Sequence, residues 1–222
     1  MSYIEVTYLD LLLSGILVLI PLLISFIQDL KLERSMIIGA LRTFIQLLFV
    51  GYVLNKVFQF ERWYLVLAMI SAMALISGFD ATRRQKIKGF RVFFIAIVSI
   101  IAGAVFSLLI VIGLVLKVKP WWGAQYIIPI GGMILGNAMN AASLAINRFY
   151  SELKSKKDEV EAYLSLGATA KQSTLSLMNE SVKSAMIPII NNMMIVGIVQ
   201  LPGMMTGQII AGTLPEEAIR YQ

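Results

Sequence analysis

The sequence predicts an all-α fold, a polytopic bundle of helices integrated in a membrane. Of the 222 residues, 58% are hydrophobic and only 14% are charged, whereas soluble domains carry about a quarter charged residues. Polar stretches separate six apolar ones, most of them near the ~20 residues that a helix needs to cross a bilayer. One polar stretch, residues 148–183, is much longer than the others. These features together indicate a polytopic protein that presents one large polar segment.

The six predicted spans follow one another along the whole chain. They are Tyr8–Ile27, Met36–Phe58, Trp63–Gly78, Val92–Leu116, Tyr126–Asn147 and Ser184–Leu201. Pro21 is a candidate kink in the first span. No basic residue precedes Lys31, so the chain lacks the basic start of a cleavable signal peptide and we expect the first span to be retained.

Basic residues concentrate in alternate loops. Lys31 and Arg34 follow the first span, and the 148–183 segment carries several lysines. The loop at 80–91 contains Arg83, Arg84, Lys86, Lys88 and Arg91. Because cytoplasmic loops carry the excess of Lys and Arg, we expect the N-terminus outside and the 80–91 and 148–183 loops in the cytoplasm. The predicted location is the inner (plasma) membrane of the cell, with direct lipid contact.

The composition excludes several kinds of chemistry. The chain has no Cys and no His, which removes disulfides, thiolate or imidazole metal sites and His-based catalysis. The segment Gly167–Lys171 lacks the second glycine of a phosphate-binding loop, so the chain cannot hold ATP in that way. The net charge of +6 is explained by membrane orientation, not by a nucleic-acid partner. We expect a chain that is not an enzyme and binds no cofactor of its own.

A short helix is predicted over residues 158–168, inside the long polar segment. Asp158 and Glu159 suit the positive end of a helix, and Gly167 suits its left-handed stop. Val160, Tyr163 and Leu164 lie on one face. This stripe is too small for a core and too short to cross a bilayer, so it fits a knob that docks into a partner's groove. The alternative is a solvated loop with an incidental helix.

The last part of the sequence predicts an interruption. The run 202–213 is rich in glycine and follows Pro202, so we expect a broken or re-entrant segment and not a regular helix. Pro215, Glu216 and Glu217 are signals for a helix start. Because the sequence ends within two turns of that start, we expect a chain truncated before a further span.

Polar residues inside apolar spans are costly and mark candidate pathways. Arg42 and Gln46 share one face of the second span, and Asn137 and Asn140 follow a Gly132-x-x-x-Gly136 pair that permits close helix approach. Hydrogen bonds between helices are the alternative role for each. The 12 methionines are either soft-metal ligands or adaptable packing. The candidate pathway residues are Arg42, Gln46, Asn137, Asn140, Asn191, Gln200, Pro202, Gly203, Thr206 and Gln208.

Four segments carry a resemblance to a known family. They are Ala40–Leu47, Ile128–Asn140, Glu161–Gly167 and Val199–Gly212. Together they make the chain resemble the FetB family of ABC-transporter permeases, a bacterial type linked to iron export with plant relatives tied to aluminium tolerance.

The resemblance implies one permease domain over residues 1–222, paired with a separate ATP-binding subunit. It implies a homodimer of permeases with two ATPases, and a further transmembrane helix after Gln222. It makes 158–168 the coupling helix, with ATP bound by the partner. Iron, as the family's substrate, favours hard oxygen donors; a metal site itself is unknown. The implied coupling residues are Glu159, Glu161, Ala162, Tyr163, Leu164 and Gly167.

Two other functions remain open from the residues. A self-sufficient secondary transporter or channel would need a coupling carboxylate, and Met36–Lys56 and Val92–Leu116 contain no Asp or Glu. A membrane scaffold without transport would tolerate changes of the polar span residues.

Overall fold

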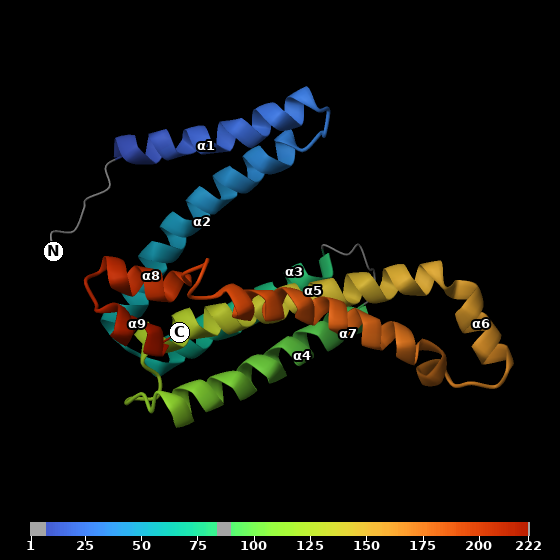
Figure 1. Cartoon of the computed structure of the whole chain (residues 1–222). Coiled ribbons are helices and arrows are strands. Elements are labelled where there is room, and N and C mark those ends of the chain that lie inside the picture. Colours follow the sequence, from blue (N-terminus) through green and yellow to red (C-terminus); the bar gives the residue numbers. More distant parts are fainter. Residues whose placement is uncertain (1–7, 84–89, 222) are drawn as a thin grey trace. The chain divides into compact units, whose positions relative to one another are not determined.

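The structure, a computed structural model, describes residues 8–83 and 90–221, except for the side chains of residues 8–14. The elements in this part of the chain are helical, which confirms the all-α prediction (Figure 1). They are α1 (Tyr8–Ile27), α2 (Glu33–Phe60), α3 (Trp63–Arg83), α4 (Phe90–Leu108), the π-helix η1 (Leu109–Val115), α5 (Ala124–Ser155), α6 (Lys157–Ser165), α7 (Ala170–Ile195), α8 (Gly203–Ile210) and α9 (Pro215–Tyr221).

Several helices are long and apolar enough to cross a membrane. Within the described residues these are α2, α3, α4 continued by η1, and α5. Helix α1 adds a shorter apolar stretch, Gly15–Ile27. The chain is therefore a helical membrane bundle, as its composition predicts.

The chain divides into two compact units, one of Met1–Gln59 with Leu201–Gln222 and the other of Phe60–Gln200. In the first unit, α1 and α2 are joined by a tight turn in which Asp29 and Lys31 have positive φ angles of 49° and 57°. The buried Ser25 hydroxyl donates to Glu33 Oε1 at 2.6 Å and accepts from the Leu32 N–H at 3.2 Å. These bonds fix the turn. In the same unit α8 and α9 pack on each other.

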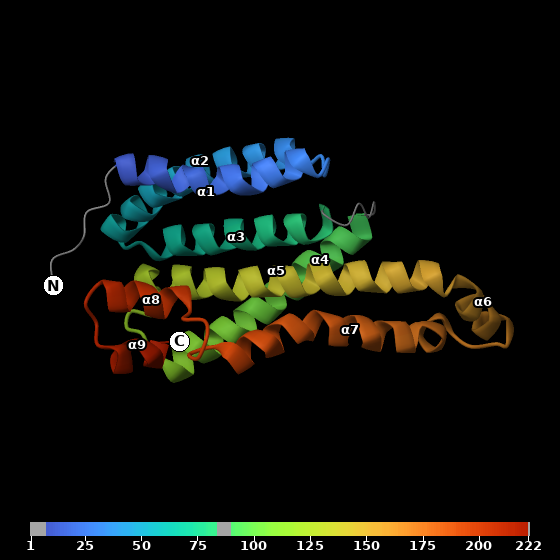
Figure 2. The ribbon, with the colours of Figure 1, turned by 45° about the horizontal axis from the view of Figure 1, so that its top comes forward.

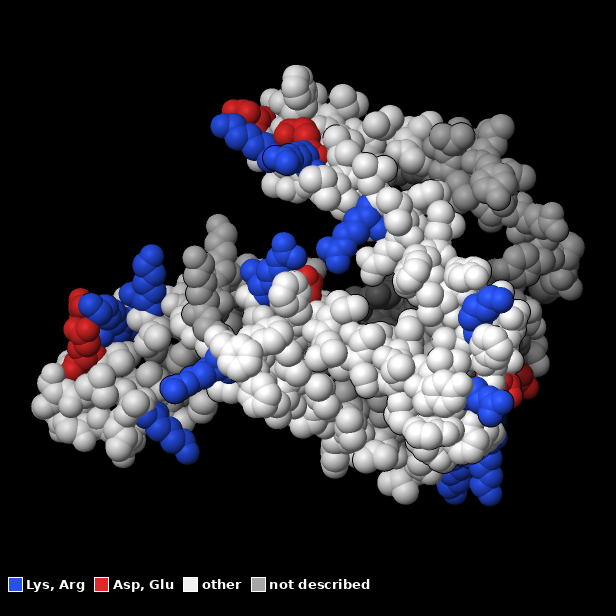
Figure 3. Space-filling view, turned by 180° about the vertical axis from the view of Figure 1, so that it is seen from behind, with Lys and Arg blue, Asp and Glu red and all other residues white. Residues whose placement is uncertain are grey.

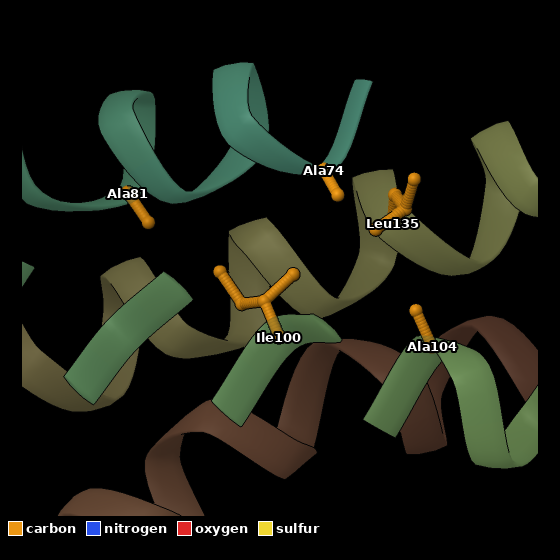
Figure 4. Close-up of a cluster of buried hydrophobic side chains, with 5 residues drawn as sticks. All are labelled: Ala74, Ala81, Ile100, Ala104 and Leu135. Carbon is orange, nitrogen blue, oxygen red and sulfur yellow. The ribbon is translucent and has the colours of Figure 1, made fainter. Parts of the chain in front are cut away.

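The core of the second unit lies between α3, α4 and α5. Ala74 and Ala81 of α3, Ile100 and Ala104 of α4 and Leu135 of α5 point toward one another (Figure 4). Three of these five residues are alanines, so the helix backbones approach closely. Leu135 is 1% exposed and fills the space between the alanines.

Glycines make the closest contacts in this core. A Cβ atom at Gly78 of α3 would overlap Ile97 of α4, and one at Gly131 of α5 would lie 2.6 Å from Ile70 Cδ1. The predicted close approach at Gly132 is present, with Met73 Cε 3.1 Å from a Cβ there. Gly136 takes no part in it, because nothing lies within 4 Å of its Cβ position. The close approach is made by the adjacent Gly131 and Gly132 instead.

Helices α5 and α7 run side by side in opposite directions, joined at one end by α6 (Figure 2). On α7, one residue per turn is buried: Ser173, Leu177, Ser181 and Ala185. The Ser181 hydroxyl donates to the Leu177 carbonyl at 2.6 Å and the Ser173 hydroxyl to the Ala170 carbonyl at 3.0 Å. The buried hydroxyls thus form their hydrogen bonds within α7. This face can therefore pack on α5 without a polar partner from that helix.

The prediction of a sixth span over Ser184–Leu201 is wrong as a single helix. Helix α7 begins far earlier, at Ala170, and ends at Ile195. Val196 is extended and Gly197 has a φ of +81°, a left-handed conformation that stops a helix. The long polar segment is correspondingly not a loop, because the ends of α5 and α7 account for most of it.

The prediction that residues 202–213 form no regular helix is also wrong. Residues Gly203–Ile210 are α-helical, and Gly212 ends the turn with a φ of +96°. A glycine inside a helix costs only ~1 kcal/mol relative to Ala. Packing and a hydrogen bond of Thr206 in the first turn of α8 can offset this cost. The Thr206 hydroxyl donates to the Pro202 carbonyl at 3.0 Å. The predicted helix start at Pro215 is confirmed by α9.

The basic loop predicted at 80–91 lies partly outside the described residues. Arg84, Lys86 and Lys88 fall in the undescribed part, 84–89. Arg83 ends α3, and Arg91 lies in the first turn of α4.

Candidate functional site

Helix α5 is longer than a membrane crossing. Its apolar part, Tyr126–Asn147, measures about 33 Å at ~1.5 Å per residue, near the ~30 Å of a hydrocarbon core. The polar residues 148–155 continue the same helix for about 12 Å more. The first part of α7, residues 170–183, runs back beside them. The α5–α7 hairpin therefore carries α6 well away from the apolar body.

Ion pairs between residues one helical turn apart lie along the base of this projection. Glu152 of α5 accepts from Arg148 at 2.6 Å and from Lys156 at 3.3 Å, both one turn away. On α7, Lys183 pairs with Glu180 at 2.9 Å. The hydrogen bond and the charge of Lys183 lower the pKa of the Glu180 carboxyl below its ordinary value, and the charges of Lys156 and Arg148 act in the same direction. Charges of α5 thus reach α7 across the hairpin.

The predicted short helix is confirmed as α6, Lys157–Ser165. Val160 is buried at 8% exposure and anchors α6, so it does not belong to the outer face. Tyr163 and Leu164 are 48% and 44% exposed. Gly167 has a φ of +90°, and its N–H donates to the Leu164 carbonyl at 3.0 Å. The predicted coupling residues therefore lie together at the end of the hairpin.

The remaining predicted coupling residues are two glutamates and an alanine. Glu159, Glu161 and Ala162 are exposed on α6, and Glu161 accepts from Lys157 Nζ at 3.4 Å. Figure 3 shows Lys, Arg, Asp and Glu side chains at the α6 end of the hairpin. The end of the hairpin thus combines exposed apolar residues with surrounding charge, the usual composition of a docking surface.

Sequence reasoning missed two features here. Leu166 is 84% exposed and extends the apolar surface of Tyr163 and Leu164. Thr169 and Gln172 form a capping box that starts α7: Gln172 N–H donates to Thr169 Oγ1 at 3.3 Å, and Thr169 N–H to Gln172 Oε1 at 2.8 Å. The Thr-x-x-Gln spacing is a known start signal and could have located α7.

The other candidate region is the end of α7. Its apolar part, residues 184–195, is about 18 Å long, too short to cross the ~30 Å core of a bilayer. The turn that follows is internally bonded, because Ile195 O accepts from the N–H groups of Val199 at 3.0 Å and Gln200 at 3.4 Å. Gly197 N–H donates to Gln200 O at 2.9 Å. Such irregular backbone is tolerated at membrane depth where protein covers it or where it lines a water-filled cavity.

The predicted pathway residues fall into both compact units. Asn137 and Asn140 on α5, Asn191 on α7 and Gln200 in the turn belong to the second unit, and all four are exposed. Arg42 and Gln46 are exposed on α2, in the first unit with Pro202, Gly203, Thr206 and Gln208. Gln208 Oε1 is buried and finds no hydrogen-bond partner among the described residues.

The metal-binding groups of this chain are hard oxygen donors and methionine thioethers. Residues 8–83 and 90–221 contain no group of three or more Asp or Glu side chains that could hold a metal ion. The amide oxygens of the pathway candidates are hard donors.

A helical bundle with several apolar spans and few charges inside them is a multi-pass membrane protein. Comparison with known families assigns it more closely. A family model described as "Uncharacterised protein family (UPF0014)" matches residues 8–222, and the chain belongs to this family.

Named relatives cover nearly the whole chain. The chain is 40% identical over 219 residues to the UPF0014 membrane protein YjkA of Bacillus subtilis, covering 97% of this chain and 84% of that protein. It is 37% identical over 220 residues to the probable iron export permease protein FetB of Escherichia coli, covering 98% and 83%. Protein ALUMINUM SENSITIVE 3 of Arabidopsis thaliana is 33% identical over 207 residues, covering 93% and 74%. The family resemblance seen in the sequence is thereby confirmed. No solved structure matches.

Proposed function

We propose that this chain is the membrane-spanning permease subunit of an ABC transporter that exports a metal ion, iron in the first place. A separate subunit binds and hydrolyses ATP, and two permeases assemble with two such subunits in the inner membrane. The name of one relative, the probable iron export permease protein FetB, supports both the permease role and iron as the substrate. Iron is the transported substrate in this proposal and not a resident cofactor.

The observation that carries the proposal is the position of α6. The helix lies at the end of the α5–α7 hairpin, with Tyr163, Leu164 and Leu166 exposed. Outside a membrane, exposed apolar side chains at a rigid tip mark a site for a protein partner. A helix that enters a partner's groove transmits movement of that partner along α5 and α7, because these two helices pack side by side and α6 joins them.

The proposed orientation is the one that the distribution of Lys and Arg among the loops predicts. The N-terminus lies outside, and the hairpin and the 80–91 loop lie in the cytoplasm, where ATP is available. Conformational change then opens a path lined by the polar groups of the spans. Amide and carbonyl oxygens near Asn191 and Gln200 would replace part of the hydration of the ion in transit.

The test is co-purification in detergent of the full-length chain with its ATP-binding subunit, compared with Glu161→Lys and Leu166→Asp. Loss of a buried interface anchor costs ~2 kcal/mol or more, which is about a 30-fold loss of affinity. We expect both variants to lose the ATP-binding subunit and the iron efflux of loaded membrane vesicles.

Lys154→Glu is the matched control, because it reverses an exposed charge on α5 beside the hairpin tip but off α6. It should retain both the subunit and the efflux. If the two α6 variants bind and transport like the wild type, the coupling role of α6 is wrong. Efflux without any ATP-binding subunit would instead support a self-sufficient transporter, and no efflux in any variant would support a scaffold.

A further inference from the structure

Two arginines lie at nearly the same level on neighbouring helices of the second unit. Arg83 ends α3, and Arg91 lies in the first turn of α4. The two helices pack on each other and run in opposite directions (Figure 2). Between them the rings of Phe79 and Phe93 meet, with centroids 6.2 Å apart. At ~1.5 Å per residue, Arg83 lies about 6 Å beyond this contact along α3 and Arg91 about 3 Å beyond it along α4.

The positive charges of this pair are not neutralised by the described acidic residues. Both side chains are exposed, and neither forms an ion pair with a described residue. Asp80, one turn before Arg83, takes part in an interaction of its own. Packed helices lie ~8–10 Å apart, so the two charges repel each other and one anion between them is within reach of both side chains.

Arg83 is already oriented at the end of α3. Its guanidinium carbon lies 5.6 Å from the centre of the Phe79 ring, and a cation over an aromatic face is attracted to it. This contact uses the flat face of the guanidinium. The N–H groups at its edge stay available, and their fork geometry matches two oxygens of a phosphate group.

The length of α3 places the pair at the edge of the hydrocarbon core. The helix begins with Trp63 and Tyr64, which are each 53% exposed and whose rings lie 6.1 Å apart. Trp and Tyr are enriched at membrane–water interfaces. From Trp63 to Arg83 the helix rises about 30 Å, which equals the ~30 Å thickness of a hydrocarbon core. The arginines therefore lie at the opposite interface, at the depth of lipid phosphates.

Exposed phenylalanines adjoin the arginines. Phe79 is 49% exposed, Phe94 57% and Phe90 80%. The rings of Phe90 and Phe94 stack, with centroids 6.5 Å apart. Along their helices, Phe79 and Phe94 lie on the membrane side of Arg83 and Arg91. A soluble anion gains nothing from such neighbours, whereas a lipid places its phosphate beside the arginines and its acyl chains beside the rings.

We propose that Arg83 and Arg91 together bind the phosphate of an anionic phospholipid, whose acyl chains lie along Phe79 and Phe94. Basic pockets between membrane helices are suited to anionic head groups. The bound phosphate offsets the repulsion between the two arginines and holds the ends of α3 and α4 together. In the proposed orientation the lipid belongs to the cytoplasmic leaflet. The site itself requires only that the chain spans a membrane, so it stands independently of the proposed transport function.

The test is native mass measurement of the full-length chain in detergent, titrated with phosphatidylglycerol or with phosphatidylcholine of the same acyl chains. We expect the wild type to retain phosphatidylglycerol at concentrations at which phosphatidylcholine is lost. Arg83→Gln and Arg91→Gln should each weaken this retention about fivefold, and the double variant about 25-fold, because each basic residue near anionic lipid contributes about that factor. Equal retention of the two lipids by the wild type would overturn the proposal.

Arg148→Gln is the matched control. Arg148 belongs to the same unit and follows the apolar part of α5, but Glu152 neutralises it at 2.6 Å. Its loss should change phosphatidylglycerol retention less than twofold. An equal loss in Arg148→Gln and Arg91→Gln would show a general effect of charge and overturn the site. Arg91→Lys keeps the charge and should stay within a few-fold of the wild type, which tests the site even if the double variant does not fold.

Two further measurements separate lipid from other anionic partners. Excess inorganic phosphate should not displace phosphatidylglycerol, and displacement would assign the arginines to a soluble anion instead. Arg91→Gln should still co-purify with the ATP-binding subunit. Loss of that subunit with unchanged lipid retention would assign the arginines to a protein partner. Either result would overturn the lipid site, and neither would contradict a permease role for the chain.

Discussion

At the scale of single residues, helix packing in this protein depends on glycines, which have no side chain to separate the helices. Gly78 of α3 allows Ile97 of α4 to occupy the space of a Cβ atom, and Gly131 does the same for Ile70. In a membrane, helices gain little from hiding apolar surface from lipid, so close backbone approach supplies much of their attraction. The α3–α4–α5 core should therefore be sensitive to the addition of one methyl group.

Gly78→Ala should destabilise the protein because its methyl group overlaps Ile97. Overpacking of this kind costs ~1–3 kcal/mol. The measurement is thermal unfolding in detergent. Gly103→Ala on α4 is the matched control, since nothing lies within 4 Å of its Cβ position and Ala is favoured over Gly in a helix by ~1 kcal/mol. Equal melting temperatures for the two variants would contradict the role of Gly78.

At the scale of elements, α7 has clear sequence signals at both of its ends. It begins at a capping box at Thr169 and Gln172 and ends at the left-handed Gly197, inside an apolar stretch. One face packs on α5, and the apolar part stops short of a full crossing. In the proposed function, α7 transmits movement from the α6 end toward the polar groups at Asn191 and Gln200.

Thr169→Ala should loosen the first turn of α7 without unfolding the hairpin. Loss of an N-cap side chain costs ~1 kcal/mol. Hydrogen exchange of the amides of residues 170–173 should become faster, while that of residues 177–185 stays unchanged.

Thr169→Asp keeps a capping oxygen and should behave like the wild type. Thr174→Ala removes a hydroxyl that bonds only the Ala170 carbonyl in the same helix, at 2.8 Å, and should also leave exchange unchanged. Faster exchange in all three variants would show that the capping box has no special role.

At the scale of the whole molecule, charge and length determine how the chain meets the membrane. The apolar spans carry few charges, and the charged residues of the α5–α7 hairpin gather toward α6. The proposed orientation places α6 in the cytoplasm and the loop at 117–123 outside. Both carry large exposed residues, Leu166 at 84% and Trp121 at 54%.

The orientation predicts opposite labelling of two single-cysteine variants. In inside-out vesicles, Leu166→Cys should react with a membrane-impermeant thiol reagent and Trp121→Cys should not. In intact spheroplasts the pattern should reverse. The unsubstituted protein has no Cys and serves as the blank. The opposite pattern would invert the orientation and remove α6 from the cytoplasm.

Most of the fold could be predicted from local chemistry. Apolar length determines the positions of α1 to α5, and Gly167 with Asp158 and Glu159 determines α6. The sequence predicts a loop at 148–183, because this long stretch is polar and lies between two apolar spans. In the structure, ion pairs one turn apart, such as Arg148 with Glu152, keep α5 helical beyond its apolar part.

The sequence by itself determined the class of the molecule, its first five apolar helices and the short helix at 157–165, because these depend on composition, periodicity and caps. Only the tertiary structure decided that Val160 is an anchor while Leu166 is free, that Gly78 and Gly131 are the contact glycines, and that α7 ends at Ile195 with a second face exposed. Those properties depend on which neighbour lies against each side of a helix. A residue's own type and its spacing do not specify that neighbour.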